Sequence, residues 1–237
     1  MVLSSSRLRW LSTLILAGLL SSSFGIAQSS SPASKTAQET SRRASHAEPA
    51  LDPGSLINGV YRNKTFAFTC KIPAGWVLRT DEINARDQQG ETPQSDNADS
   101  GKTAPAPASS AGAKVLLAAF SRPPQAKGDD VNSSILIVAE NAASYPGLKE
   151  AVQYFDPLTE VAKAQGFSVD EEPYEIAIGS KTLVRGDFHK DVATRVMRQS
   201  TLVMLSHGYV VSFTVIGGTD DEVEELIGGL DFTAKSK

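Results

Sequence analysis

Residues 61–76 read YRNKTFAFTCKIPAGW, and this segment shows the alternating pattern of a half-buried β-strand. The apolar side of the alternation consists of Phe66, Phe68, Cys70 and Ile72. Pro73 lacks a backbone donor and Gly75 frees the backbone, so the pattern predicts a turn that delivers Trp76 as an apolar anchor. We therefore expect the rest of the chain to supply strands and helices that pack against this strand.

The first 27 residues have the three parts of a secretory signal peptide. Arg7 and Arg9 precede a short apolar core at residues 10–20, and small residues at 25–27 predict cleavage before Gln28. An uncleaved membrane anchor is the alternative, but this core is shorter than the roughly 20 residues that span a bilayer. We expect a periplasmic or secreted protein, with a form tethered through an uncleaved signal as the alternative.

Two further segments have a composition that is typical of disorder. Residues 28–54 are rich in Ser, Ala, Thr and Pro and predict a flexible tether. Residues 81–112 contain six acids, two bases and three prolines, with Ile83 as the one large aliphatic residue. Because residues 61–78 are too few to fold alone, we interpret 81–112 as a disordered insertion rather than a domain boundary. A single domain over 55–235 follows.

The second half of the chain predicts an antiparallel sheet with helices. Nearly continuous apolar runs at 114–120 and 134–140 are typical of central strands that are covered on both faces. Helical spacing at 148–162, with Pro157 inside it and Gly166 after it, predicts a kinked helix or two short helices. Strand-like runs that short turns join, and that must therefore be antiparallel neighbours, lie at 174–178, 181–190, 192–205 and 209–216.

The last predicted element is a short helix with a clear start signal. Thr219 followed by Glu222 predicts a capping box, and Asp220 and Asp221 suit the positive end of the helix dipole. Together these elements define an α+β fold, an antiparallel β-sheet with helices packed on it.

Charge excludes two classes of partner. The whole chain has a net charge of −4, and removing residues 1–27 removes two arginines, which leaves 21 basic against 27 acidic residues, or −6. An acidic chain lacks the basic surface that binds nucleic acid or anionic lipid. The lone Cys70 forms no internal disulfide, and its place on the apolar side of the strand predicts a small buried hydrophobe.

Arg185, Asp187 and His189 form the most suggestive polar set, because they share one face of a predicted strand. Depending on register, the neighbouring strands would add Arg198 or Gln199 and Ser212 or Thr214. An Asp–His relay is the one catalytic arrangement that this face would hold. A hydrolase also needs a nucleophile within reach and an oxyanion hole, and no Gly-x-Ser-x-Gly elbow is present. We interpret the face as a candidate binding surface, with a solvated face or an ion pair as the simpler alternative.

No metal or cofactor site is predicted. His189 with Asp187 and Asp191 offers ligand types without a recognised spacing, and one cysteine excludes structural zinc. The acidic runs at 129–130 and 170–172 match no EF-hand pattern and leave weak calcium binding as an open alternative.

The order of elements resembles that of the PsbP-like superfamily. The motifs that carry the resemblance are Tyr-x-Asn at 61–63, Phe-x-Phe at 66–68, Pro-Ala-Gly-Trp at 73–76 and Gly-Tyr at 208–209. This resemblance implies an α/β/α sandwich around an antiparallel sheet, over about 55–235 less the insertion. Members include photosystem II extrinsic subunits, a Ran-binding nuclear import factor and bacterial proteins of unknown role. The family implies adaptor or accessory proteins and transfers no active site.

These observations favour an exported binding or accessory protein of the cell envelope that is not an enzyme. An exported hydrolase of unknown substrate is the alternative. The expected partner is an envelope protein or a small ligand, with no nucleic acid and no stable membrane insertion after signal cleavage.

The signal pattern yields the first testable prediction. We expect the mature N-terminus to lie at Gln28 or within a few residues of it, because small residues at 25–27 fit a signal peptidase. N-terminal sequencing of the protein from the cell-envelope fraction checks this. Finding Met1 or Val2 at the N-terminus would refute export by cleavage.

Overall fold

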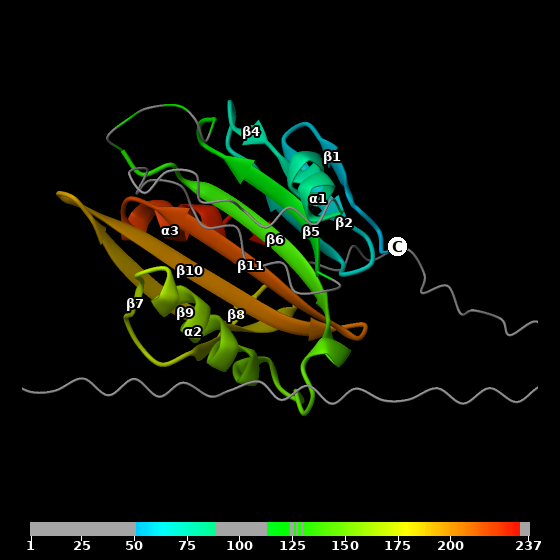
Figure 1. Ribbon diagram of the computed structural model, residues 1–237. Helices are drawn as coiled ribbons and strands as arrows, with labels where there is room; N and C mark the ends of the chain where they lie inside the picture. Colours follow the sequence, from blue (N-terminus) through cyan, green and yellow to red (C-terminus); the bar gives the residue numbers. More distant parts are fainter. Residues whose placement is uncertain (1–50, 89–112, 124–125, 127, 129, 233–237) are drawn as a thin grey trace, which may run out of the picture. The chain divides into compact units, whose positions relative to one another are not determined.

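Two antiparallel sheets carry the fold in the part of the chain that the structure describes (Figure 1). The structure is a computed structural model, and it describes residues 51–88, 113–123, 126, 128 and 130–232. The predicted signal peptide, most of the predicted tether and residues 89–112 of the predicted insertion lie outside the described residues.

The larger sheet contains most of the strands, and every pairing in both sheets is antiparallel. Its spatial order is β4 (Val77–Leu78), β5 (Ala113–Phe120), β6 (Ser134–Asn141), β11 (Tyr209–Gly217), β10 (Arg195–Ser206), β9 (Lys181–Val192) and β7 (Ser168–Val169), with β8 (Tyr174–Ile178) also paired to β9. The smaller sheet has the order β1 (Ser55–Ile57), β2 (Val60–Asn63), β3 (Phe68–Lys71) and β12 (Leu230–Asp231). The predicted antiparallel sheet with packed helices is confirmed.

Strand positions in the second half of the chain agree with the predictions. β8 spans the predicted residues, and β9, β10 and β11 are successive antiparallel neighbours. β6 lies between β5 and β11, as its continuous apolar run predicted.

The segment 61–76 forms a hairpin rather than one strand, which corrects the prediction. β2 ends at Asn63, residues 64–67 form a turn, and β3 begins at Phe68. The buried Asn63 side chain holds the turn, because its Oδ1 accepts from the Phe66 N–H at 2.9 Å and its amide donates to the Asp52 carbonyl at 3.0 Å. The alternating pattern predicted one continuous strand because Phe66, which lies in the turn, is buried as deeply as Phe68, which lies in β3.

The N-terminal boundary of the domain also differs from the prediction. The Asp52 carboxylate accepts from the backbone N–H groups of Gly54 and Lys64, each at 2.9 Å, and these bonds hold the pKa of Asp52 below its ordinary value. The Tyr61 hydroxyl donates to the Pro53 carbonyl at 2.8 Å. Residues 51–54 therefore belong to the domain and not to the tether.

An apolar layer joins the two sheets. Phe68 of β3 meets Phe213 of β11 edge-on, with ring centroids 4.9 Å apart and planes at 81°. Phe232 contacts both rings, and helix α3 (Asp220–Ile227) closes the same layer. Edge-to-face aromatic packing of this kind adds to the gain from burial itself.

The opposite face of the larger sheet carries other helices (Figure 1). A short 3-10 helix, η1 (Ala142–Ser144), is followed by a second, η2 (Ala151–Tyr154), and then by α2 (Phe155–Ala164). Two short helices were predicted, but the change from one to the other falls before Phe155, and Pro157 lies inside α2. Gly186 of β9 makes room for the Phe155 ring, since a Cβ on this glycine would lie 2.4 Å from a ring carbon.

Helix α3 forms half of the predicted capping box. The Thr219 hydroxyl accepts from the Glu222 N–H at 3.2 Å, as predicted. The Glu222 carboxylate accepts from the Gly218 N–H at 2.8 Å and from the Ser133 hydroxyl, instead of returning to the Thr219 N–H. The second half of the motif therefore ties the helix to the residue before β6.

The predicted disordered insertion begins too early, because residues 81–88 belong to helix α1 (Thr80–Gln88). The Thr80 hydroxyl accepts from the Ala118 N–H at 2.9 Å. The Asn84 side chain accepts from the Val115 N–H at 3.1 Å and donates to its carbonyl at 2.9 Å. These bonds dock α1 on β5, where Ile83 joins a small apolar cluster.

The buried amide that holds the hairpin yields a second prediction. We expect Asn63→Ala to lower the free energy of unfolding by about 2 kcal/mol, because the substitution leaves buried backbone groups without partners. Lys64→Ala, at the exposed neighbouring position, is the control and should cost no more than about 0.5 kcal/mol. Urea denaturation measures both variants. Equal losses for the two would show that the amide does not hold the turn.

Candidate functional site

The predicted polar face on β9 is present, and two of its three side chains, Arg185 and Asp187, bind each other and neighbouring elements. Arg185 and Asp187 form an ion pair, with Nε 2.9 Å from Oδ1. Arg185 also pairs with Glu224 of α3 at 2.5 Å, and Asp187 accepts from the Tyr174 hydroxyl at 3.0 Å. Because the two side chains are only 13% and 17% exposed, these contacts tie β9 to β8 and α3 more than they offer a free surface.

The same contacts fix the charge states in this network. Burial lowers the pKa of the Arg185 guanidinium, but its bonds to Glu224 and Asp187 outweigh burial and leave the pKa above its ordinary value. Burial and the bond to Asp187 raise the pKa of Tyr174 to about 12. Arg185 is therefore charged and Tyr174 neutral near pH 7, and internal partners account for both without a ligand.

His189 has a different partner from the other two members of the face. Its Nδ1 contacts the carboxylate of Asp170, which lies just after β7. Its neighbour in β10 is Arg198, and Arg198 pairs with Asp220 of α3 at 3.0 Å. The Asp–His relay that the sequence offered, with Asp187 on the imidazole, is therefore not the pairing that the structure contains.

Strand register decides which other candidate side chains share this face. Arg198 shares it, whereas Gln199, Ser212 and Thr214 lie on the opposite face of the sheet. Ser200 lies directly opposite Asp187, but its hydroxyl is fully buried and has no hydrogen-bond partner within the described residues. Among those residues, no serine hydroxyl hydrogen-bonds to His189.

Metal and thiol chemistry have little support in the part of the chain that the structure describes. Within it, no group of three or more His, Cys, Asp or Glu side chains is placed to hold a metal ion. Cys70 is fully buried, and burial raises the pKa of its thiol to about 12. Since the thiolate is the reactive form, this cysteine is a packing residue at neutral pH.

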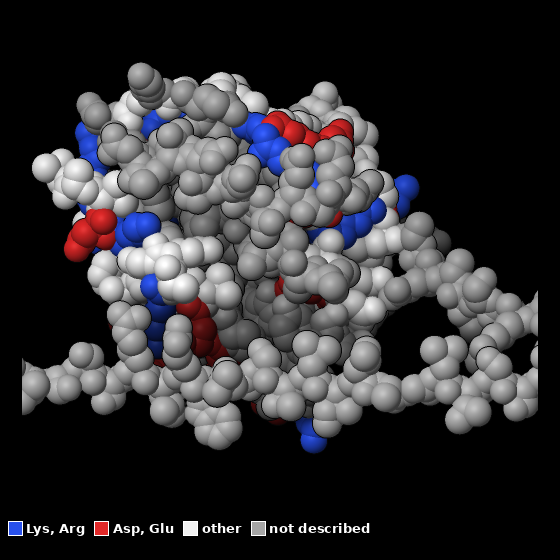
Figure 2. Space-filling view, viewed as in Figure 1, with Lys and Arg blue, Asp and Glu red and all other residues white. Residues whose placement is uncertain are grey.

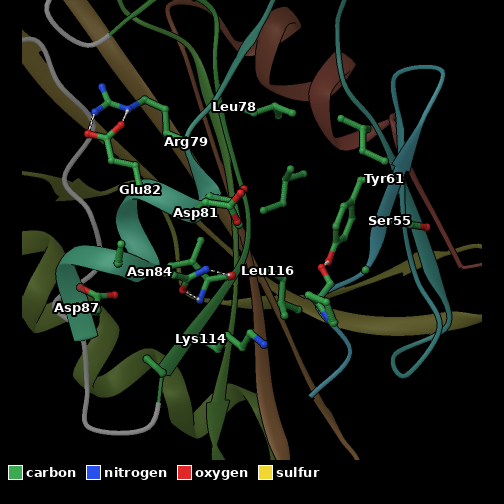
Figure 3. A pocket seen from close by; sticks show the side chains of 18 residues that line it. Ser55, Tyr61, Leu78, Arg79, Asp81, Glu82, Asn84, Asp87, Lys114 and Leu116 are labelled. Atoms are coloured by element: carbon green, nitrogen blue, oxygen red, sulfur yellow. Dashed lines mark hydrogen bonds and ion pairs between the residues drawn. The ribbon is translucent and has the colours of Figure 1, made fainter. Parts of the chain in front are cut away.

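A groove of about 1140 Å³ lies beside α1, and we call it the α1 groove (Figure 3). Residues 113–117 of β5 line it together with α1. Residues 53–56 and Tyr61 line it from the smaller sheet. The groove therefore lies where the smaller sheet ends over the larger one.

Most polar side chains of the α1 groove already have partners. Glu82 pairs with Arg79 and, at 2.7 Å, with Arg86, so bases and acids lie side by side over α1 (Figure 2). Asn84 is held by the backbone of β5, and Lys114 donates to the Leu51 carbonyl at 3.3 Å. These residues build the walls of the groove.

Asp81 is the exception among the described acids of the groove. Its carboxylate has no hydrogen bond or ion pair with any residue that the structure describes, and Figure 3 shows it pointing into the groove. Leu56 and Leu78 line the same groove and are 41% and 45% exposed. The α1 groove thus combines apolar surface with one unpaired negative charge.

Sequence reasoning missed this groove because it assigned α1 to the insertion. The available signal was Thr80 followed by Asp81 and Glu82, which are residue types that favour the first turn of a helix. The polar composition of the following residues outweighed that signal.

Comparisons with known proteins identify no family. No family model matches the sequence, and no curated protein matches it. A protein of unknown function from Pseudomonas aeruginosa is similar in structure, with a TM-score of 0.31, 18% identity and coverage of 43% of this chain and 68% of that one.

Two other solved structures show a similar degree of likeness. LpqN of Mycobacterium tuberculosis, which is involved in cell envelope biogenesis, has a TM-score of 0.32, 14% identity and coverage of 68% of this chain and 76% of that one. A Bacteroides thetaiotaomicron protein has a TM-score of 0.33, 11% identity and coverage of 72% of this chain and 47% of that one. Likeness at these TM-scores carries no implication for the function of this chain.

The polar face on β9 yields a third prediction. We expect Asp187→Ala to lower the free energy of unfolding by about 2 kcal/mol, because it removes the acceptor of Tyr174 and one partner of the largely buried Arg185. His189→Ala should cost about 0.5 kcal/mol, since its side chain is 36% exposed. Urea denaturation of both variants checks this. A loss for His189→Ala as large as that for Asp187→Ala would contradict the division of the face.

Proposed function

We propose that this chain is an exported, non-enzymatic binding or accessory protein of the cell envelope, of the PsbP-like type. The observation that carries the proposal is the α1 groove, in which exposed leucines and the unpaired Asp81 carboxylate are held on a docked helix and a sheet edge. Concave sites with apolar lining and a few placed polar groups are typical of ligand binding. The predicted face with Arg185, Asp187 and His189 becomes a support for α3 and β8 in this proposal.

The geometry favours binding over hydrolysis. A hydrolase needs a nucleophile, a base that contacts it and a group that orients the base. The His189 imidazole contacts Asp170, and Ser200, the serine nearest to Asp187 in register, makes no hydrogen bond within the described residues. Ser168 lies opposite His189 in register, but within the described residues its hydroxyl makes no hydrogen bond to the imidazole, so no contact between a nucleophile and a base is formed there.

Export rests on the N-terminal pattern of residues 1–27. No helix within the described residues is long and apolar enough to cross a membrane. The net charge of −6 that remains after removal of residues 1–27 gives no electrostatic attraction to anionic lipid. We therefore propose a periplasmic or secreted location, with a signal-tethered form as the alternative.

Site-specific photocrosslinking tests the groove as the binding site. A photoreactive residue is placed at Leu78 in the groove, or at Val169 in β7 as a control with similar exposure, in cells that export the chain. We expect a discrete adduct from the Leu78 position and none from the Val169 position. Identical adduct patterns, or none from either position, would contradict binding at the α1 groove.

A further inference from the structure

Strand β1 leaves an edge of the smaller sheet open beside the α1 groove. Within the described residues, β1 pairs with β2 alone and stands at the end of its sheet. Its sequence, Ser-Leu-Ile, has none of the charges or prolines that usually protect sheet edges. Leu56 is 41% exposed and Ile57 is 67% exposed, so the strand presents apolar side chains on both faces. Although β1 is only three residues long, its uncharged apolar edge is open to pairing with another strand.

The hairpin register shows which backbone groups face outward. Asn58 and Gly59 form a two-residue turn with φ of 51° and 73°, and Ile57 pairs with Val60 on either side of it. In such a hairpin the flanking residues form the hydrogen-bonded pair, and hydrogen-bonded and non-hydrogen-bonded pairs alternate along the strands. The next residue, Leu56, therefore directs its N–H and C=O away from β2 and toward an incoming strand.

An added strand would lie over the α1 groove. Leu56 is the direct cross-strand partner of Tyr61, so both side chains point to the same face of the smaller sheet. Tyr61 belongs to the apolar layer between the sheets, and residues 53–56 line the groove. A strand beside β1 would continue the smaller sheet over β5 and α1 and place its inward side chains against Leu78 and Leu116.

The charges that line the α1 groove favour an incoming strand with a basic side chain. The described acids that line the groove are Asp81, Glu82 and Asp87, and the described bases are Arg79 and Lys114, which gives 2 − 3 = −1. Arg79 and Glu82 neutralise each other as an ion pair. Since Asp81 has no partner among the described residues, a basic side chain on the incoming strand would meet a carboxylate that none of them neutralises.

From these observations we infer that the α1 groove binds an extended segment of a partner protein, which pairs with the free edge of β1 and places a lysine or arginine against Asp81. The inference rests on the proposed function and names the chemistry of the occupant. Strand addition of this kind takes its affinity from backbone hydrogen bonds and its specificity from alternate side chains.

A synthetic peptide tests the inference directly. The probe is a fluorescent peptide of roughly seven residues, a usual strand length, that alternates valine and threonine and carries one lysine at an inward position. A set of probes moves the lysine along the inward positions. Fluorescence anisotropy with the full chain should show saturable binding for at least one probe. The same probe with glutamate in place of lysine, or with methylated backbone nitrogens, should bind at least about threefold more weakly.

Paired protein variants locate the site. Asp81→Asn should weaken binding of the lysine probe about threefold to tenfold and leave the glutamate probe no weaker than before. Asp221→Asn makes the same charge change in the first turn of α3 and should change nothing. Leu56→Ser should weaken every probe, whereas Leu205→Ser, at a strand leucine that is 36% exposed, should not.

Three results would overturn the inference. One is the absence of saturable binding by any probe. Another is equal binding to the Asp81→Asn and Asp221→Asn variants. The third is a concentration-dependent dimer in sedimentation that Leu56→Ser abolishes, because a second copy of this chain would then occupy the edge. If no peptide binds while the Leu78 crosslink still forms, the proposed binding function stands with an occupant that is not a peptide.

Discussion

The stacking of the smaller sheet on the larger one is the constraint on which the rest of the structure depends. Leu202, Val211 and Phe213 are fully buried on the face of the larger sheet that the smaller sheet covers. Burying each such side chain contributes about 1.5–3 kcal/mol. Without β2 and β3 that face would be open to water, so the N-terminal hairpin is required for the core and is not an appendage of it. The last strand, β12, then pairs with β3 and joins the two ends of the domain.

Within the described residues the smaller sheet has four strands and the larger one has eight, so the smaller sheet does not cover the whole face of the larger one. Different features lie beyond the two edges of the smaller sheet. Beyond β12, α3 extends the cover, and its acidic side chains neutralise Arg185 and Arg198 on the larger sheet. Beyond β1, no described strand continues the layer, and the α1 groove remains. One mismatch in width therefore explains both the ion pairs near α3 and the open groove near α1.

The sequence predicted those elements whose pattern is local. The strands at 174–178 and 209–216 and the Thr219 cap depend on near neighbours in the chain, and they are confirmed. The turn at 64–67 was not predicted because its aromatic residue, Phe66, is buried and therefore continues the alternating pattern of the strand. β12 was not predicted because a strand of two residues is too short to show an alternating pattern. The polar face on β9 was placed correctly, but its partners Glu224 and Asp170 come from distant segments, and no single-sequence pattern carries such pairings.

The polar face on β9 and the α1 groove contain similar types of residue, but they differ in whether their polar groups have hydrogen-bond or ion-pair partners. A polar group that already has internal partners gains little from a ligand, because binding would exchange one set of bonds for another. Arg185 and Asp187 are in this condition, and their bonds stabilise the contact between β9 and α3. At the α1 groove, the Asp81 carboxylate and the outward N–H and C=O of Leu56 have no partner among the described residues that a ligand would have to displace. The polar residues that the sequence singled out on β9 thus already have partners within the protein. The groups without a partner among the described residues lie on α1 and β1, where the polar composition or the short length of the segment did not predict a site.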